Sequence, residues 1–337
     1  MNDIVYTLNN NSENISEYIN STFEGKSTLI IATLPFKILM ILLTIFLNFM
    51  IILSNTIQKK DKTFSTYLLL SITISDLIVG CFSMSFMTIF TYYAYWPLGY
   101  ILCAFWVIVD YSTSTVNLIS IFILTFQRFL LIKYPFAVSE KLTNLKIAII
   151  FIPWILGFSY WIVSVVIITN NDTFDYINCY FTSTFIYVIT SDIIAFFLPI
   201  ILITIFSILT IYELNLKRRK TNLKKKQKLE LSISNNFSSV KQTGSKSTGS
   251  KEKKYTFSKE EKAVLCITIL TINIILLWGI FLVSWPLYAI CNYCVDMVVM
   301  EIGYWFTYLP STTNPIILLI FNKHVRKNII KFILFKN

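Results

Sequence analysis

The chain has 337 residues and a formal net charge of +11; 55% of its residues are hydrophobic and only 14% are charged. Because a soluble globular domain carries about 25% charged residues, this composition excludes an ordinary soluble protein. A mean hydropathy of +0.65 indicates a protein whose main solvent is lipid.

Seven apolar runs follow one another along the sequence, each close to or above the roughly 20 residues that a helix needs to cross a bilayer. They lie at about 34–57, 65–90, 100–132, 146–168, 185–212, 262–290 and 300–320. Each run is too long for a β-strand, so we expect helices. The sequence therefore predicts an all-α membrane protein in which residues 34–320 form a seven-transmembrane helix bundle, with the two ends of the chain on opposite sides of the membrane.

The basic residues are confined almost entirely to one side of these helices. All but Lys26 and Lys37 of the 29 Lys and Arg residues lie at 58–64, 128–146 and 213–262 or after residue 322. By the positive-inside rule these segments are cytoplasmic, and the tail 1–33 is extracellular. We therefore expect a multi-pass plasma-membrane protein whose positive charge contacts anionic membrane lipid rather than nucleic acid. Glycosylation motifs on the expected outer side begin at Asn10, Asn14, Asn20 and Asn171.

Two of the cytoplasmic segments have distinct compositions. Residues 213–262 have a middle rich in Ser, Gly and Lys, which predicts a basic and partly disordered third cytoplasmic loop between extensions of the fifth and sixth helices. Residues 321–337 alternate basic residues with Ile and Phe at helical spacing. This pattern predicts a short amphipathic helix along the inner membrane surface, followed by the cytoplasmic tail.

Four of the six cysteines lie at the expected outer ends of helices or in outer loops, where disulfides persist. Cys103 opens the third helix and Cys179 precedes the fifth, so a bridge between them would hold the long outer loop against the bundle. Cys291 and Cys294 are candidates for a second, tight bridge. No metal site is expected, because the only histidine, His324, lies on the opposite side.

The third span carries two charges in an otherwise apolar sequence, Asp110 near its outer end and Arg128 near its inner end. They lie about 27 Å apart on one helix face, which Ser114 and Asn117 continue. Because an intramembrane carboxylate is costly unless it faces a protein interior or a wet cavity, this face must point into the bundle. The partner of Asp110 is then either a basic side chain or a ligand cation. The spans offer almost no base at this level except Lys37, which favours the ligand.

Aromatic residues gather at the level of Asp110 on three of the spans: Tyr111, Trp278, Phe281, Tyr304, Trp305 and Tyr308. The faces of aromatic rings attract ammonium groups. In a chain with 16% aromatic residues, ordinary packing accounts for any single ring. The set together with Asp110 favours a site for a small amine.

The order and spacing of several short motifs resemble rhodopsin-like (class A) G protein-coupled receptors, and within that group most closely the muscarinic acetylcholine receptors. The resemblance runs from about residue 36 to 334. It is carried by Asn48, LSITISDL with Asp76, WPLG before Cys103, DY at 110–111, QRF at 127–129, GFSYW after Trp154, Pro199, KEEKA at 259–263, GYW at 303–305 and NPIIL at 314–318. It implies a receptor, and no enzyme, that passes ligand binding on to a heterotrimeric G protein.

The same resemblance implies roles for individual residues. The amine would bind Asp110, and Arg128 would contact the G protein. The other expected ligand-binding residues are a lid of Tyr111, Phe281 and Tyr304, a floor and wall of Trp278 and Tyr308, and Ser114. A polar cluster that holds a sodium ion in inactive receptors would consist of Asp76, Asn48, Asn117, Ser311 and Asn314. A water-filled, hydrogen-bonded kink fits these cluster residues nearly as well, and no other cofactor is expected.

Three positions near the inner side depart from the pattern of the family. Gln127 stands where the resemblance implies an acidic residue that restrains the adjacent arginine. Ser207 and Leu318 replace two tyrosines that work as a pair in active receptors. These replacements predict a different contact between the inner ends of the helices and leave the basal activity open.

The pocket departs from the muscarinic pattern as well. Phe281 lacks the usual tyrosine hydroxyl, and Leu282 replaces an asparagine that engages the ligand's ester. Asp192 is an additional carboxylate, which either binds a second amine, as in a histamine-type ligand, or faces a neighbouring polar residue. Acetylcholine is the first expectation and another biogenic amine such as histamine is the alternative. A membrane transporter is disfavoured because internal repeats are absent and the number of spans is odd.

Overall fold

The computed structural model describes residues 31–56, 64–93, 95–170, 174–175, 179–181, 185–239, 259–291, 294–321, 325–327 and 329–330. Its elements in chain order are a first helix Ile31–Thr56, α2 (Phe64–Ile78), the π-helical turn η1 (Val79–Ser83), α3 (Met84–Tyr93), α4 (Gly99–Lys133), α5 (Pro135–Asn170), strands β1 (Phe174–Asp175) and β2 (Tyr180–Phe181), α6 (Phe185–Asp192), the π-helical turn η2 (Ile193–Phe197), α7 (Leu198–Ser239), α8 (Lys259–Ile290) and α9 (Met297–Phe321).

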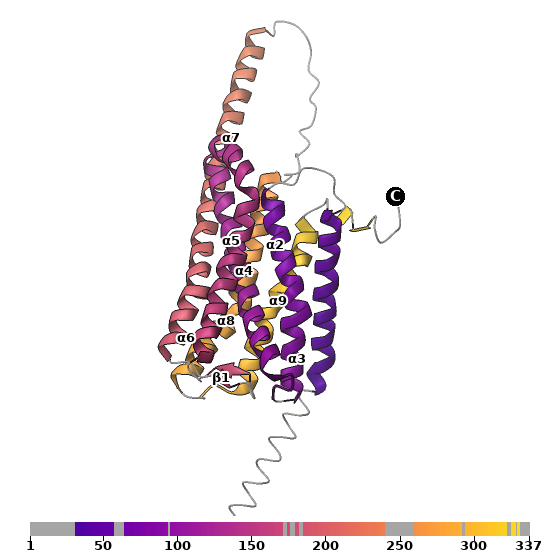
Figure 1. Ribbon diagram of the computed structural model, residues 1–337. Helices are drawn as coiled ribbons and strands as arrows, with labels where there is room; N and C mark the ends of the chain where they lie inside the picture. Colours follow the sequence, from indigo (N-terminus) through magenta and orange to yellow (C-terminus); the bar gives the residue numbers. More distant parts are fainter. Residues whose placement is uncertain are drawn as a thin grey trace, which may run out of the picture.

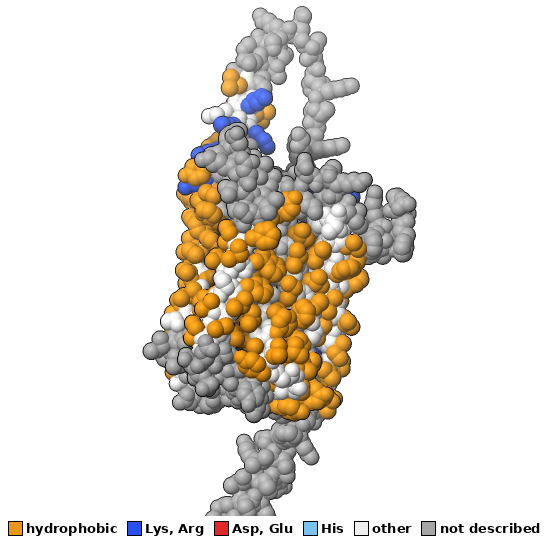
Figure 2. Space-filling model, viewed as in Figure 1, with side chains coloured by type: hydrophobic (Ala, Val, Ile, Leu, Met, Phe, Trp, Pro, Cys, Tyr) orange, Lys and Arg blue, Asp and Glu red, His pale blue; other side chains and the backbone are white. Residues whose placement is uncertain are grey.

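The helices form a bundle of seven rods, because α2, η1 and α3 are continuous, as are α6, η2 and α7 (Figure 1). Six of the rods are long and apolar enough to cross a membrane. The seventh, α9, is less apolar, since tyrosines, prolines and Asn314 that face the interior interrupt it. Hydrophobic side chains cover the flank of the bundle (Figure 2). The predicted seven-helix membrane fold is therefore confirmed.

Two helices extend further than their apolar runs indicated. The segment 128–146, which we expected to be a loop, is helical except at Tyr134, because α4 continues to Lys133 and α5 begins at Pro135. Proline suits the first turn of a helix, where its missing N–H is not needed. Helix α7 continues to Ser239 beyond the bundle, as the predicted cytoplasmic extension of the fifth helix, and carries there the basic side chains visible in Figure 2. Lys and Glu form helices well in water, so the loss of hydrophobicity marks the membrane surface and not the helix end.

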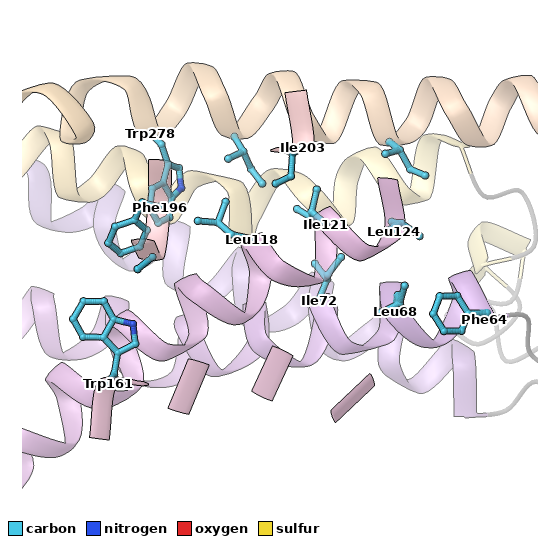
Figure 3. Close-up of a cluster of buried hydrophobic side chains, with 13 residues drawn as sticks. Phe64, Leu68, Ile72, Leu118, Ile121, Leu124, Trp161, Phe196, Ile203 and Trp278 are labelled. Carbon is cyan, nitrogen blue, oxygen red and sulfur yellow. The ribbon is translucent and has the colours of Figure 1, made fainter. Parts of the chain in front are cut away.

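The bundle interior is a hydrophobic cluster that runs along the helix axes (Figure 3). Phe64 of α2 lies at one end and Trp161, Phe196 and Trp278 lie at the other. Close helix contact depends on Gly157 of α5, where an added Cβ would lie 3.0 Å from the Ser112 carbonyl oxygen and 3.0 Å from Val116 Cγ2. The absence of a side chain at this position therefore lets α5 pack directly against the backbone of α4.

Gly157→Ala should destabilise the protein by about 1–3 kcal/mol, the usual cost of overpacking a tight interior contact. Gly279→Ala on α8 is the matched control, because a Cβ there meets nothing within 4 Å. We expect its only effect to be a gain in helix propensity of up to about 1 kcal/mol. Thermal unfolding of the purified, detergent-solubilised variants measures both. Equal behaviour of the two variants would contradict the close contact of α4 with α5.

Both predicted disulfides are present. Cys103 of α4 is bonded to Cys179, with Cα atoms 5.6 Å apart, and Cys291 is bonded to Cys294. The first bridge attaches the β1–β2 hairpin, in which Phe174 pairs with Phe181, to the outer end of α4. The four predicted glycosylation sites, residues 240–258 of the predicted basic loop and residues 331–337 of the tail lie outside the described residues. Within the tail, 325–327 and 329–330 are helical, and Val325 and Ile329 are buried against the bundle.

Candidate functional site

Asp110 points into the interior of the bundle from α4, as predicted, and is only 7% exposed. The hydroxyls of Ser83 and Tyr308 face its carboxyl group. Asp110 Oδ1, Ser83 Oγ and Tyr308 Oη form no hydrogen bond of normal geometry among the described residues, so the two hydroxyls make at most weak contacts with the carboxyl group. A buried carboxylate that faces neutral hydroxyls lacks a compensating charge, so this group of polar atoms fits a site that is completed by something from outside the chain.

A π-helical turn in the rod formed by α2, η1 and α3 brings Ser83 to this site. Ser83 is the last residue of the π-helical turn η1. The extra residue in such a turn rotates the helix beyond it by about 100° relative to a regular helix. Gly80 within η1 lets the rod approach the first helix, since a Cβ there would lie 3.1 Å from Thr44 and from Ile45 side-chain atoms. The periodicity of the sequence gave no sign of this rotation.

The predicted aromatic lid lies beside Asp110. The hydroxyls of Tyr111 and Tyr304 are hydrogen-bonded at 2.9 Å, and the ring of Phe281 lies 4.9 Å from that of Tyr304 in an edge-on contact. These three residues from α4, α8 and α9 therefore meet as expected.

Two further aromatic residues pack beside the lid residues and form an aromatic wall with them. These two residues were not singled out from the sequence. Trp161 of α5 stacks on Tyr111 at 4.6 Å, and its Nε1 donates to Thr115 Oγ1 at 2.9 Å. Phe196 of η2 packs against Trp278 at 5.1 Å. The tryptophan of GFSYW was visible as part of a motif, whereas nothing in the sequence distinguished Phe196 from the many other phenylalanines.

The predicted polar cluster forms around Asp76, which is 1% exposed. Its Oδ1 accepts hydrogen bonds from Asn117 Nδ2 at 2.8 Å and Ser311 Oγ at 2.7 Å, and its Oδ2 accepts one from Asn314 Nδ2 at 3.1 Å. Asn48 joins through its Nδ2, which donates to the Ser311 carbonyl oxygen at 2.9 Å. The structure therefore brings all five residues of this set together.

A cavity of about 20 Å³ lies between the polar cluster and the aromatic wall, lined by Ser114, Asn117, Trp278, Tyr308, Ser311 and Asn314 among others. A cavity needs at least roughly 10–15 Å³ to hold a water molecule, so this one accommodates a water or an ion and is too small for a ligand. The Oδ1 atoms of Asn48 and Asn314 are buried with no hydrogen-bond donor among the described residues. Ser114, which we expected in the ligand site, lines this lower cavity.

The outer ends of the first helix and α9 are joined by an ion pair that the sequence reasoning missed. Lys37, only 4% exposed, has its Nζ 2.5 Å from Glu301 Oε1 and 5.4 Å from the ring centre of Trp305. Lys37 was the one basic residue at the level of Asp110. Because it is engaged with Glu301, it is not the partner of Asp110.

At the inner end, Gln127 is buried and its Oε1 accepts a hydrogen bond from Ser65 Oγ of α2 at 2.9 Å. Arg128 lies near Cys266 of α8. Helices α7 and α8 are joined by an ion pair in which Arg218 Nε lies 2.6 Å from Glu261 Oε1. Gln127 thus anchors α4 to α2 through a neutral hydrogen bond. Ion pairs at this end link α7 to α8 and, between Lys133 Nζ and Glu213 Oε1 at 3.9 Å, α4 to α7.

The two replaced tyrosine positions each make another contact. Ser207 Oγ of α7 lies 3.3 Å from Thr271 Oγ1 of α8. Leu318 of α9 is 5% exposed and packs in an apolar cluster with Leu270 of α8, the first helix and Val325 of the tail. The inner ends are therefore joined by one hydroxyl contact and one hydrophobic contact, in agreement with the prediction of a different arrangement there.

Comparison with known proteins gives matches to seven-transmembrane receptors. The family model "7 transmembrane receptor (rhodopsin family)" matches residues 47–318. The chain is 30% identical to muscarinic acetylcholine receptor M2 of Gallus gallus over 212 residues, which are 57% of this chain and 44% of that receptor. It is 31% identical to muscarinic acetylcholine receptor M4 of Gallus gallus over 173 residues, 49% of this chain and 35% of the relative. The chain thus spans less than half of the length of these relatives.

Proposed function

Because this chain belongs to the rhodopsin family of seven-transmembrane receptors, we propose that it binds a small ammonium ligand at Asp110 and signals through a heterotrimeric G protein. It is a multi-pass protein of the plasma membrane, with its N-terminus outside, and it is not an enzyme. Acetylcholine is the ligand that we propose first, on the basis of the likeness to muscarinic receptors.

The observation that supports this proposal most is the state of Asp110. Its carboxyl group is buried, its Oδ1 has no hydrogen-bond partner among the described residues, and the nearest basic residue of the outer level pairs with Glu301. Ionisable groups inside a membrane protein ordinarily have a functional partner. An ammonium group supplies the missing charge, and aromatic rings such as those of Tyr111 and Tyr304 attract a group of this kind.

The cluster around Asp76 supports a second proposal, that it binds a sodium ion. The carboxylate of Asp76, the hydroxyl of Ser311 and the orphaned Oδ1 of Asn314 are hard oxygen donors of the kind that an alkali cation prefers, and the adjacent cavity has room for an ion. These residues join α2, α4 and α9 through Asp76. A cation here would stabilise the helix arrangement in which the three rods converge.

Signalling requires that the ligand favours one helix arrangement over another. A ligand at Asp110 contacts α4, α8 and α9 at once, because the lid residues come from these three helices. Any shift of α8 at the outer end is transmitted to the inner end, where Arg128 lies near Cys266 of α8. Two of the contacts that α8 makes there with α7, at Thr271 and Glu261, are polar. A second arrangement that exchanges them would open a surface for the G protein around Arg128.

A second-messenger screen in cells that express the chain tests the proposal. We expect a saturable response to acetylcholine and carbachol that is absent from cells without the chain, with surface expression confirmed by an extracellular epitope. A promiscuous G protein α-subunit removes dependence on the native coupling partner. Protein at the surface that is silent towards cholinergic ligands and all common biogenic amines would overturn the proposed function while leaving the fold in place.

A further inference from the structure

The outer end of α9 is attached to the first helix by a buried charge pair that has no part in the proposed signalling. Lys37 Nζ lies within hydrogen-bond distance of Glu301 Oε1 and also of Thr91 Oγ1 of α3, the latter at 3.4 Å. The side chain of Lys37 is 5% exposed and that of Glu301 is 23% exposed. A single ammonium group therefore joins the outer ends of the first helix, α3 and α9.

Stability alone does not account for a charge pair at this place. Desolvation of two buried charges largely offsets their attraction, and well-packed apolar side chains often hold two helices equally well. What a buried pair adds in some proteins is specificity, because only one arrangement of the helices brings its two charges together. Such specificity has a use where one of the helices carries residues of a binding site.

The face of α9 that carries Glu301 also leads to the amine site. Trp305 and Tyr308 follow at four and seven residues, so they lie on the same side of the helix. The ring of Trp305 lies 5.4 Å from Lys37 Nζ and contacts the ring of Tyr308 edge-on, with ring centres 5.8 Å apart. The hydroxyl of Tyr308 faces Asp110. A chain of contacts thus connects the ion pair with the carboxyl group that we propose binds the ligand.

The aromatic residues on this part of α9 are held mainly by packing. Trp305 Nε1 and Tyr308 Oη form no hydrogen bond of normal geometry among the described residues. Towards α8, the ring of Tyr304 contacts those of Phe281 and Trp285, at 4.9 and 6.3 Å. Packed helices slide past each other by small amounts when a protein changes its conformation. The charge pair with the first helix limits such sliding of α9.

We propose that Lys37 and Glu301 are positioning residues for the amine site. Their charge pair fixes the outer turns of α9, and with them Tyr304 and Tyr308, relative to Asp110. Neither member of the pair touches the ligand. Because binding groups have to be held within about 0.5 Å of their productive places, release of α9 lowers the affinity for the ligand even when the fold is retained. This inference rests on the proposed function, the binding of an amine at Asp110.

The variant Lys37→Met/Glu301→Met separates position from stability, because it removes both charges and should recover most of the stability of the fold. The probes are carbachol and tetramethylammonium, and their affinities for the purified receptor are measured as ligand-induced thermal stabilisation. We expect both probes to bind the folded double variant about tenfold more weakly than the wild type, within the range of residues that act on a ligand without contacting it.

Two further variants serve as controls. Lys37→Arg keeps the charge pair and should bind both probes with nearly the affinity of the wild type. Lys226→Met/Glu230→Met removes the same two charges from the exposed part of α7, where Nζ and Oε1 are 3.9 Å apart. This variant should leave both affinities unchanged.

A double-mutant cycle with Tyr308 tests the route from the ion pair to the ligand. In the wild type, Tyr308→Phe should lower the affinity for carbachol, since it removes the hydroxyl that faces Asp110. In the Lys37→Met/Glu301→Met background the same substitution should have a smaller effect, because the hydroxyl is already displaced. A pair with a purely structural role would give additive effects instead.

Wild-type affinity of the folded double variant would overturn the positioning role, and so would additive effects in the cycle. If the double variant did not fold, Lys37→Met alone provides the same comparison, since Glu301 reaches water and the fold tolerates the loss of its partner. Either result would leave the amine at Asp110 in place. If the wild type bound neither probe, the proposed function would fail and this inference with it.

Discussion

Asp110→Asn should abolish the response to ammonium ligands, with a loss of potency of about 100-fold or more, because truncating one partner of a buried charge pair costs several kcal/mol. The substitution keeps the size of the side chain and removes only its charge. Concentration–response curves for second-messenger production measure the loss, with surface expression determined in the same cells.

The stability of the ligand-free protein separates this role from a structural one. Asp110 Oδ1 has no hydrogen-bond partner among the described residues, so the neutral amide should leave the apparent melting temperature of the empty receptor unchanged or raise it. Asp110→Glu, which keeps the charge but lengthens the side chain, should retain a weakened response. A normal response of Asp110→Asn would place the ligand elsewhere, and marked destabilisation of its empty form would assign Asp110 to the architecture.

Glu301→Met should destabilise the folded protein by about 3 kcal/mol, because breaking a buried ion pair leaves the remaining charge without compensation. The stranded residue would be Lys37, whose side chain is only 5% exposed. The reverse variant, Lys37→Met, should cost less, because the side chain of Glu301 is 23% exposed and reaches water more readily. Thermal unfolding of the detergent-solubilised variants shows which of the two substitutions lowers the stability more.

The double variant Lys37→Met/Glu301→Met is the control for this pair. Replacing both partners by apolar side chains of similar volume is often nearly neutral, so it should recover most of the stability lost in Glu301→Met. If the double variant were as unstable as the sum of the two single variants, the two residues would act independently. That result would contradict the contact between the first helix and α9.

Much of the site could be placed from the sequence because its members lie in register on long helices. Asp110 and Tyr111 are adjacent, and Tyr304 and Tyr308 are one turn apart, so the helical repeat alone brings each pair to one level. The five residues of the Asp76 cluster came from the resemblance, and the structure joins them by hydrogen bonds or shared contacts. The sodium ion itself stays a prediction.

Other members could not be found in this way because they depend on contacts between helices. Glu301 follows the expected outer end of the last apolar run by a single residue, and nothing in that run indicates that it meets Lys37 from the other end of the chain. Trp161 and Phe196 are two of many aromatic residues, and only packing shows that they extend the wall next to Tyr111. The polar composition of the segment after Pro135 predicts a loop, whereas α5 begins there, because polarity marks the water phase and does not stop a helix.

The sequence by itself determined that the chain crosses the membrane seven times and which side faces the cytoplasm, since the length of an apolar run and the charges beside it are local properties of the chain. Only the tertiary structure decided which buried charges have partners. Lys37 has one in Glu301, whereas Asp110 Oδ1 and Asp192 Oδ2 have none among the described residues. The physical reason is that the partner of a buried charge comes from another helix, as Lys37 of the first helix does for Glu301 of α9. An almost uniformly apolar run does not record which neighbouring helix its polar side chains face.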